Sequence, residues 1–588
     1  MRNSSELMVK VWDYHIVGFL VILLFISISV KASEPTSLQT IFNGKITGDS
    51  IQDSNMLSLI PDSYPTYQFD EVELMLPSSQ KLANIKEIEN AFKENEQVRV
   101  LVWVKKGENY KKVIKSLKDL QIIYEYESSN GFATVLSRQQ FTQLKRNHLV
   151  DYLALDQEVS LHLAQSVSII NATVVQNPSN NDYNLTGRNV GVCILDTGIN
   201  YNHSALSAGY IGGYDLVNND PFPYDDNGHG TKVAGIIGSK NSLNKGVSPD
   251  ARLVVVKVLD SGALGFTSTI AAGIDWCVNH KSQYNISVIS MSLGSGIYNP
   301  STNPGIYEPS LLNAYNNNIA VVASSGNDGS TTGIAYPAIS PYVISVGATY
   351  DANLGSVTTP GVCTDTTTSA DKVTCYSNRA PFLDLMAPGT LITTTTMAGG
   401  FSSVTGTSMS APHVSGVIAL MNERNPNMLP AQVKNILNYT GKSLLDTSTS
   451  LNFRRVNALN AVDSTPYITK SGTFTALGVI NFTVHDTLNP GNVYVLALGL
   501  TTTPGTPLPD GRIVPVNLED PVLQLSLQNP TSIGLVNSVS TLDSNGLGVA
   551  TFSLPNIPGL SSYTVYAVFV TVDPVTGNIL SVSSPRKL

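Results

Sequence analysis

The sequence predicts three folded parts: a small α+β module, an α/β domain built on a parallel sheet, and a C-terminal β-sandwich. A chain of 588 residues is too long for a single hydrophobic core. Between residues 164 and 465, near-continuous runs of Val and Ile alternate with helical patterns, which is typical of a buried parallel sheet. From residue 466 to 588, short strand-like runs separated by turn signals indicate an antiparallel β-sandwich.

The first 32 residues are typical of a secretory signal peptide. Arg2 and Lys10 precede an apolar run from Ile16 to Val30, and small residues at its end predict cleavage after Ala32. An uncleaved membrane anchor is the alternative, but this run is short for a hydrocarbon core of about 30 Å. We therefore expect a secreted, extracellular protein with no membrane span after processing. Residues 33–96 follow as a polar N-terminal extension.

Residues 97–163 show a regular order of strand and helix patterns. Side chains alternate along the first segment as in a strand, and the second has apolar residues at helical spacing. The predicted elements are strand Gln97–Val104, helix Asn109–Leu120, strands Ile122–Glu127 and Gly131–Leu136, helix Arg138–Leu144, and strand Val150–Leu155. This β-α-β-β-α-β order predicts a small sheet with helices on one face.

The two larger parts are predicted from short runs of the same kind. In the α/β domain the strand and helix patterns are Val190–Leu195, Lys232–Gly238, Arg252–Val258, Thr269–Asn279, Val288–Met291, Ile319–Ala323, Val343–Val346 and Ser408–Asn422. In the sandwich the strand-like runs are Phe474–Leu477, Asn492–Leu500, Val522–Leu527, Gly548–Leu554 and Tyr563–Asp573.

The net charge of the chain argues against one class of binding partner. A net charge of -9 gives no attraction to a phosphate backbone and argues against a nucleic-acid partner.

The four cysteines are interpreted in two ways. Cys363 and Cys375 flank a polar loop, and in an oxidising compartment a disulfide between them would stabilise the fold by about 2–3 kcal/mol in the chain-entropy model. Cys193, in a strand pattern, and Cys277, in a helical pattern, are interpreted as small buried hydrophobic residues.

Three segments of the α/β domain carry residues suited to nucleophilic catalysis. A hydrophobic strand ends at Asp196, although such a carboxylate can equally cap a helix or a turn. His229 lies between two glycines at the start of a helical pattern, where its imidazole is accessible for proton transfer. Ser408 precedes a long apolar helix, whose N-terminus would stabilise negative charge. A serine hydroxyl becomes a nucleophile when an imidazole oriented by a carboxylate removes its proton.

A fourth segment ends an apolar strand with Asn327. Its side-chain N–H and the main-chain N–H of Ser408 can together bind the oxyanion of a tetrahedral intermediate. In the order Asp, His, Asn, Ser, the four segments resemble the motifs of the subtilisin family, and they read Asp196-Thr197-Gly198, His229-Gly230-Thr231, Ser325-Gly326-Asn327 and Gly406-Thr407-Ser408-Met409-Ser410-Ala411-Pro412-His413.

The resemblance covers residues 97 to 462 and implies a subtilisin-like fold and a serine endopeptidase, a hydrolase. It implies a catalytic triad of Asp196, His229 and Ser408, with Asn327 in the oxyanion hole. Residues 97–163 resemble the inhibitory propeptide of the family, so the chain is expected to be a zymogen. The junction resembles the maturation site of the family, which implies self-cleavage between Leu163 and Ala164.

The same matching implies how a substrate binds. An extended peptide is expected to add as a strand between residues 259–266 and 292–294. The primary pocket is expected to be lined by residues without charge, namely Ser292, Leu293, Gly294, Ser324, Ser325 and Gly326. We therefore expect broad specificity, with large apolar side chains favoured before the scissile bond. His413 is expected to form a hydrogen bond within the helix that follows Ser408.

Two departures from the family concern bound ions. The loop at 238–249 is shorter than in calcium-binding relatives and contains Lys245, and Ala205 stands where an acid would help to bind calcium, although Gln165 is matched. We therefore expect no required cofactor and do not favour a structural calcium ion. The run Asp225-Asp226-Asn227 suggests a different ion, but a solvated loop is the preferred interpretation.

The expected partners are protein or peptide substrates and the chain's own propeptide, acting on a monomer. A non-catalytic binding protein is the second hypothesis, in which the β-sandwich would carry the function and the protease fold would be a vestige. The complete set of Asp196, His229, Ser408 and Asn327, with a propeptide ahead of them, argues against a vestige. Reaction with a serine-directed phosphonate separates the two hypotheses.

Overall fold

The computed structural model describes residues 85–86, 88–93, 95–156, 158–161, 166–179, 183–556 and 562–588. The predicted signal peptide, most of the predicted polar extension, and Leu163 and Ala164 at the predicted junction lie outside the described residues. The chain divides into two units, and the elements described below belong to the larger one, Leu76–Val572 with Ile579–Leu588. Within the described ranges, no helix is both long and apolar enough to cross a bilayer.

The N-terminal module has the predicted order of elements. They are β1 (Gln97–Val104), α3 (Tyr110–Lys115), β2 (Gln121–Tyr126), β3 (Gly131–Ser137), α4 (Arg138–Lys145) and β4 (Val150–Leu155), in an antiparallel sheet of order β2-β3-β1-β4. The valines of β1 pack against both helices, and Ile88 and Phe92 from the preceding helical residues join this core. The opposite face of β1 is also buried, since Leu101 and Trp103 are almost fully covered.

The α/β domain is built on a nine-stranded sheet with the order β20-β21-β17-β14-β12-β10-β6-β8-β7. All neighbouring strands are parallel except β20 and β21, which form a hairpin. The strands are β6 (Gly191–Asp196), β7 (Tyr210–Asp215), β8 (Arg252–Lys257), β10 (Ile286–Met291), β12 (Ala320–Ser324), β14 (Val343–Thr349), β17 (Leu385–Pro388), β20 (Lys442–Asp446) and β21 (Leu451–Arg455). The predicted parallel sheet is confirmed.

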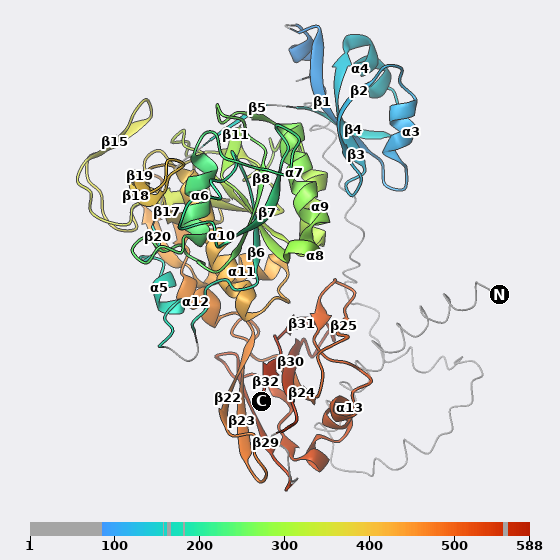
Figure 1. Cartoon of the computed structure of the whole chain (residues 1–588), viewed down its shortest axis with the longest axis vertical. Coiled ribbons are helices and arrows are strands. Elements are labelled where there is room, and N and C mark those ends of the chain that lie inside the picture. Colours follow the sequence, from blue (N-terminus) through green and yellow to red (C-terminus); the bar gives the residue numbers. More distant parts are fainter. Residues whose placement is uncertain are drawn as a thin grey trace, which may run out of the picture. The chain divides into compact units, whose positions relative to one another are not determined.

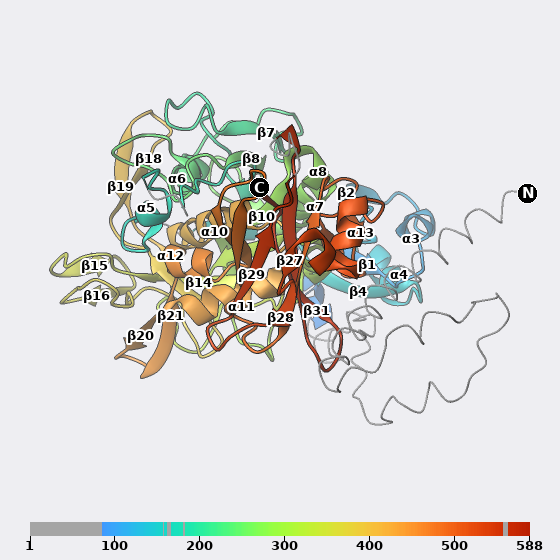
Figure 2. The same cartoon turned by 90° about the horizontal axis from the view of Figure 1, so that it is seen from below.

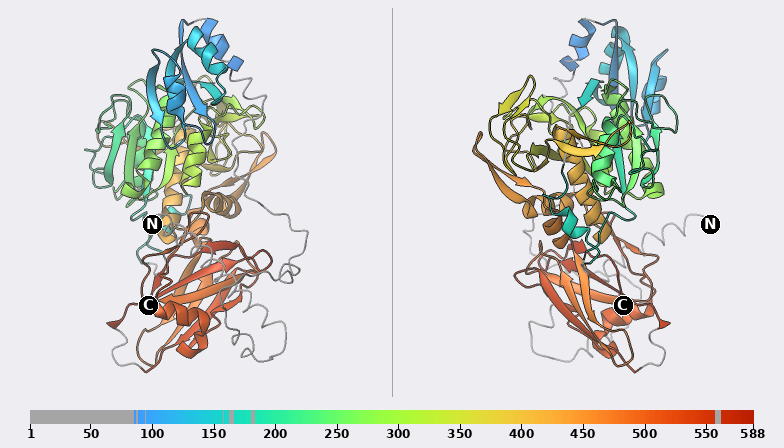
Figure 3. Two further views of the ribbon diagram at one scale, coloured as in Figure 1. Left: turned by 90° about the vertical axis from the view of Figure 1, so that its right-hand side faces the viewer. Right: turned by 60° about the vertical axis from the view of Figure 1, so that its left-hand side comes forward.

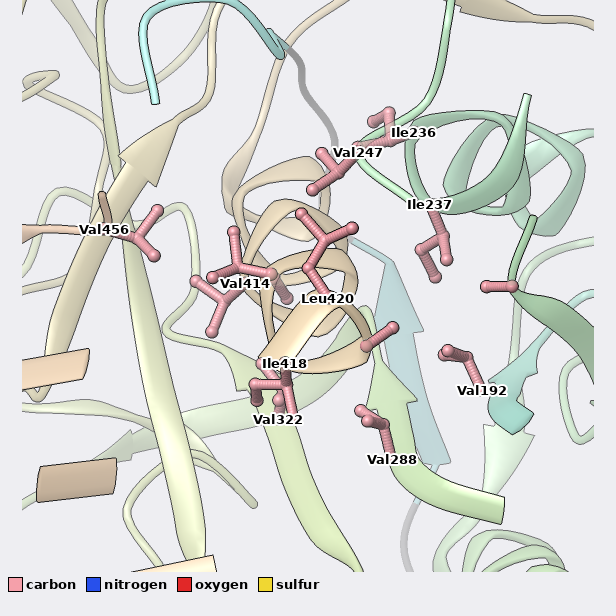
Figure 4. Close-up of a cluster of buried hydrophobic side chains, with 14 of the residues drawn as sticks. Val192, Ile236, Ile237, Val247, Val288, Val322, Val414, Ile418, Leu420 and Val456 are labelled. Atoms are coloured by element: carbon pink, nitrogen blue, oxygen red, sulfur yellow. The ribbon is translucent and has the colours of Figure 1, made fainter. Parts of the chain in front are cut away.

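Helices cover both faces of this sheet (Figure 1). One face is covered by α5 (Ala172–Val175), α6 (His229–Gly238), α10 (Thr407–Arg424), α11 (Pro430–Thr440) and α12 (Ala458–Asp463). Figure 4 shows Val192, Val288 and Val322 of the strands directed toward α10. The other face is covered by α7 (Thr267–Asn279), with α8 (Lys281–Tyr284) and α9 (Glu308–Asn316) beside it. Because successive side chains of a strand point to opposite faces, both faces of each central strand are apolar.

The C-terminal part is the predicted β-sandwich, whose two sheets are visible in Figure 3. One sheet contains β22 (Tyr467–Gly472), β23 (Val479–His485), β27 (Leu535–Val536) and β29 (Leu547–Ser553). The other contains β24 (Val493–Gly499), β28 (Val539–Thr541), β30 (Tyr566–Val572), β31 (Ile579–Val582) and β32 (Arg586–Lys587). Phe482 of the first sheet and Leu496 and Phe569 of the second belong to one core.

Two of the strand predictions in the sandwich are wrong. Val522–Leu527 lies in the helix α13 (Pro521–Gln528), seen beside the strands in Figure 2. The carboxylate of Asp520 accepts hydrogen bonds from the N–H groups of Val522 and Leu523, and Pro521 takes the first helical position. An N-cap and an N1 proline decide for the helix where a short apolar run alone is ambiguous. Residues 474–477 form part of the turn between β22 and β23.

The predicted disulfide between Cys363 and Cys375 is confirmed. It anchors the hairpin of β15 (Val357–Thr359) and β16 (Cys363–Asp365), which projects from the domain in Figures 1 and 2. The interpretation of Cys193 and Cys277 as unpaired hydrophobic residues is wrong, because they form a second disulfide with a Cα–Cα distance of 6.2 Å. Cys193 lies on the face of β6 that α7 covers, and only the packing of α7 brings Cys277 to it.

Candidate active site

Asp196 and His229 meet at the carboxyl edge of the parallel sheet. Asp196 is the last residue of β6, and His229 is the first residue of α6. The Nδ1 atom of His229 lies 2.7 Å from Oδ1 of Asp196, and both side chains are almost completely buried. Oδ1 of Asp196 also accepts a hydrogen bond of 2.8 Å from the main-chain N–H of Thr197. This arrangement fixes the imidazole with Nδ1 as the donor, which leaves Nε2 able to act as a base.

The loop that precedes His229 is organised by Asp225, which the sequence interpretation placed in a solvated loop. That interpretation is wrong, because Asp225 is fully buried. Its carboxylate accepts hydrogen bonds from the N–H of Gly228 at 2.7 Å, the N–H of Thr231 at 2.8 Å and the hydroxyl of Thr197 at 2.9 Å. Burial by itself raises the pKa of Asp225, but these hydrogen bonds outweigh it and hold the pKa below its ordinary value.

A buried lysine lies beside this loop and was not identified from the sequence. Lys257 ends β8 directly opposite Asp196, and its side chain is fully buried. Its Nζ donates to the carbonyl groups of Thr197 and Leu259, each at 2.8 Å, and to Oδ1 of Asp226 at 2.7 Å. The ammonium group thus ties together the residues that follow β6, precede His229 and follow β8. A lysine at the end of a buried Val-rich strand was the signal available in the sequence.

Ser408 is the second residue of α10, which packs against α6 and against the ends of β10 and β12. Its side chain is buried, and among the described residues its Oγ has no hydrogen-bond partner. The main-chain carbonyl of Ser408 accepts a hydrogen bond from the hydroxyl of Ser292, so the first turn of the helix is fixed to the end of β10. His413 donates from Nδ1 to the carbonyl of Met409 at 2.8 Å, which confirms its predicted bond within the helix.

Asn327 lies next to Ser408 and has a fixed orientation. Its Oδ1 accepts hydrogen bonds from the main-chain N–H of Thr407 at 2.8 Å and from the hydroxyl of Thr407 at 3.0 Å. Because both bonds engage the oxygen of the amide, the amide nitrogen faces away from Thr407. The sequence motif predicted Asn327, but it did not predict that the residue before Ser408 would orient it.

The two predicted walls of the substrate cleft flank a segment of the chain itself. β5 (Glu158–Leu161) lies between β11 (Leu293–Tyr298) and β9 (Gly265–Phe266) in a sheet of order β13-β11-β5-β9, where β13 is Ile334–Tyr336. Both pairings of β5 are antiparallel, with Leu161 opposite Leu293 and Glu158 opposite Phe266. This segment of the chain is therefore added as a strand between β11 and β9.

The predicted pocket residues lie at two neighbouring strand ends. Ser292, Leu293 and Gly294 follow β10 and begin β11. Ser324 ends β12, and Ser325 and Gly326 continue toward Asn327; a Cβ atom on Gly294 or on Gly326 would lie within 3.4 Å of the side chain of Ala335. Both groups of residues thus approach the same buried alanine.

The N-terminal module contacts the α/β domain through the start of α7. Asp156 accepts hydrogen bonds from the main-chain N–H of Ser268 and, at 2.7 Å, from the hydroxyl of Thr267, so it caps this helix. Arg99 donates from Nε to Asp156 at 2.8 Å and from Nη2 to Ser268 at 2.7 Å. Its guanidinium group lies 3.5 Å from the ring centre of Phe266.

A second set of contacts lies farther along α7 and before α9. The indole Nε1 of Trp103 donates to the carbonyl of Ile306 at 3.0 Å. The hydroxyl of Ser129 donates to the carboxyl group of Asp275 at 2.6 Å. Burial raises the pKa of Asp275 to about 6. These contacts explain why the face of β1 that carries Trp103 is buried.

The loop considered for calcium is stabilised by its own hydrogen bonds. Oδ1 of Asn241 accepts from the N–H groups of Leu243 and Asn244 at 3.0 and 2.9 Å. Asp250, at the end of the loop, pairs with Lys240 at 2.6 Å and accepts from the hydroxyl of Thr186. The oxygen atoms of Asn241 and Asp250 are thus engaged by donors of the chain itself.

Comparisons with known proteins agree with this arrangement. The subtilase family matches residues 187–457, and the peptidase inhibitor I9 family matches residues 84–162. The chain is 34% identical over 338 residues to the alkaline protease of Alkalihalobacillus alcalophilus, a match that covers 56% of this chain and 79% of that protein. It is 33% identical over 340 residues to subtilisin E of Bacillus subtilis (strain 168), which covers 57% of this chain and 81% of that protein.

Among solved structures, a cold adapted subtilisin-like serine proteinase matches with 29% sequence identity and a TM-score of 0.40, covering 50% of this chain and 99% of that chain. The family assignment depends on the sequence comparisons, which extend over most of each bacterial relative. The chain therefore belongs to the subtilase family of serine peptidases, with an I9 inhibitor module ahead of its peptidase domain.

Proposed function

We propose that the protein is a secreted serine endopeptidase that hydrolyses peptide bonds through a triad of Asp196, His229 and Ser408. The observation that carries the proposal is the buried pair of Asp196 and His229, 2.7 Å apart, on a helix packed against the one that presents the Ser408 hydroxyl. In the first step Nε2 of His229 takes the proton of Ser408 while Oγ attacks the carbonyl carbon. Asp196 stabilises the imidazolium that forms.

The second half of the reaction uses the same groups. The oxyanion accepts hydrogen bonds from the amide nitrogen of Asn327 and the main-chain N–H of Ser408, at the N-terminus of α10. Collapse of the tetrahedral intermediate breaks the C–N bond, and His229 gives its proton to the leaving amine. Water then hydrolyses the acyl-enzyme, with His229 again as the base.

The strand pairing of β5 supports self-processing. Glu158–Leu161 belongs to the segment that joins the I9 module to the peptidase domain, and it lies between β9 and β11 as a substrate would. We propose that the chain cuts itself between Leu163 and Ala164 and that the released module remains as an inhibitor. The uncharged residues at the ends of β10 and β12 favour apolar side chains before the scissile bond, with broad specificity.

The experiment that tests this function compares two serine substitutions in α10. Ser408→Ala should leave the 62.9 kDa precursor uncut apart from signal removal, as read by intact mass. Ser410→Ala is the matched control, because Ser410 is also buried in α10 and donates to the carbonyl of Ala387. It should mature and react with a serine-directed phosphonate. Maturation of purified Ser408→Ala would refute self-cleavage, and failure of the wild-type protein to be labelled would refute the triad.

The oxyanion assignment has its own test. Asn327→Ala should lower kcat by about 10²- to 10³-fold with little change in KM, because the donor acts on charge that develops only in the transition state. The measurement is steady-state hydrolysis of an apolar peptide substrate, with the concentration of active sites taken from phosphonate titration. An unchanged kcat would remove Asn327 from the reaction.

A further inference from the structure

The turn that carries Asn327 is held by a buried asparagine from a different part of the chain. Asn378 is fully buried, and its Oδ1 accepts hydrogen bonds from the N–H groups of Asp328 at 3.0 Å and Ser330 at 2.9 Å. Its Nδ2 donates to the carboxylate of Asp328 at 2.7 Å. One side chain thus fixes both the main chain and the side chain of the residue directly after Asn327.

The main chain of Asn378 fixes the other side of the same turn. Its N–H donates to the carbonyl of Gly326 at 2.9 Å, and its carbonyl accepts from the hydroxyl of Ser325 at 2.8 Å. Gly326 has a φ of +105°, and a Cβ atom there would lie 2.3 Å from Nδ2 of Asn378. The residues before and after Asn327 are therefore both bonded to Asn378, in a space where only glycine fits at position 326.

The chain segment around Asn378 is itself held by hydrogen bonds and a disulfide. The next residue, Arg379, donates from Nε to Asp446 at 2.7 Å, and both side chains are buried. The N–H of Arg379 donates to the carbonyl of Ser330 at 2.8 Å, and the disulfide at Cys375 lies three residues before Asn378. The segment that presents Asn378 is thus tied to β20, to the turn and to the β15–β16 hairpin.

We propose that Asn378 is a positioning residue that sets the place of the Asn327 amide in the oxyanion hole. Thr407 fixes the rotation of the Asn327 amide by donating to the amide oxygen. Asn378 fixes the position of the main chain on either side of Asn327, at Gly326 and Asp328. An oxyanion donor acts over a narrow range of distances, and a displacement of about 1 Å can cost up to 10²-fold in rate. This inference rests on the proposed role of Asn327.

A double-mutant cycle tests the proposal. Asn378→Ala should lower kcat by about 10- to 100-fold with little change in KM, because the Asn327 donor is then misplaced. In an Asn327→Ala background the same substitution should change kcat by less than about 2-fold, since no donor is left to misplace. Asn425→Ala is the matched control, because Asn425 is also buried and lies at the opposite end of α10 from Ser408. Its side chain donates to the carbonyl groups of Pro466 and Val582 and accepts from the N–H of Asn427.

A polarity exchange provides a second test that does not depend on the alanine variant folding. Asn378→Asp places a carboxylate against that of Asp328 and should lower kcat as Asn378→Ala does. Adding Asp328→Asn restores one donor and one acceptor between the two positions and should recover most of kcat.

The outcomes are distinct. If Asn378→Ala lowers kcat by the same factor in the Asn327→Ala background as in the wild-type protein, the proposed role of Asn378 is wrong. It is also wrong if kcat does not recover in the variant that combines Asn378→Asp with Asp328→Asn. The proposed function fails separately, if the phosphonate does not label Ser408 in the wild-type protein.

Discussion

His413 links the stability of the active-site helix to pH. Its imidazole is completely buried in α10, five residues after Ser408, with Nδ1 donating to Met409 and Nε2 accepting from the N–H of Ser166. Burial lowers the pKa of His413 to about 4, because a charged imidazolium would lose its hydration. The neutral ring suits both hydrogen bonds, since one nitrogen must donate and the other must accept.

The size and sign of the effect follow from linkage. The pKa of a histidine in an unfolded chain is about 6.5, and each tenfold change in proton affinity corresponds to about 1.4 kcal/mol. Below about pH 6.5 the unfolded chain binds a proton that the folded protein does not. The free energy of unfolding should therefore fall as the pH drops from about 6.5 to about 4, by about 3 kcal/mol from His413 alone, and this loss should be absent at neutral pH.

The assay is urea unfolding of the uncut Ser408→Ala chain at several pH values between 7 and 4, with and without His413→Asn. Asparagine keeps an N–H that can donate to Met409 but has no group that titrates in this range. The buried carboxyl groups contribute equally to both proteins, so the difference between the two curves isolates His413. The variant should be less stable at pH 7, and the gap should narrow by about 3 kcal/mol toward pH 4. A gap that stays constant with pH would refute the reasoning.

Two further predictions concern the cross-links and the I9 module. Replacing Cys193 and Cys277 by alanine should lower Tm more than replacing Cys363 and Cys375. The bridges span 84 and 12 residues, and the chain-entropy model gives them stabilisations of about 4–5 and about 3 kcal/mol. Calorimetry under non-reducing conditions measures both changes in Tm, and equal losses would contradict the model. Ser129→Ala should destabilise the uncut Ser408→Ala chain by about 1–3 kcal/mol at pH 7, where the carboxyl of Asp275 is ionised, and by less at pH 5, where it is protonated. A loss independent of pH would show that this hydrogen bond is not coupled to the charge.

Some features of this protein were predictable because they are local. The β1 strand of the I9 module shows its alternation directly. The glycine after His229 marks a close approach of other groups, since a Cβ atom on Gly230 would lie 2.1 Å from the carbonyl oxygen of Gly198. Local patterns failed where two structures suit the same residues. The run at Val522 is apolar enough for a strand, and the Asp520 cap and Pro521 decided for a helix.

Other features depend on which segments meet in space. Nothing near Cys193 in the sequence indicates that α7 will bring Cys277 to it, because the partner lies on another element and the other side of the sheet carries α10. Asp225 was interpreted as solvated because it is one of several adjacent polar residues, yet its carboxylate accepts hydrogen bonds from N–H groups at the start of α6. Burial of that carboxylate is a property of the fold and not of its neighbours in the chain.

The sequence by itself supplied the proposed chemistry of this protein: the candidate acid, base, nucleophile and amide, their order along the chain, and the kind of sheet that carries them. Only the tertiary structure decided how those groups are held. Lys257, Thr407 and Asn378 lie on three different segments, and each acts through hydrogen bonds to residues distant in the chain. A hydrogen bond depends on distance and direction in space, and the position of a residue in the chain specifies neither until the sheet has formed.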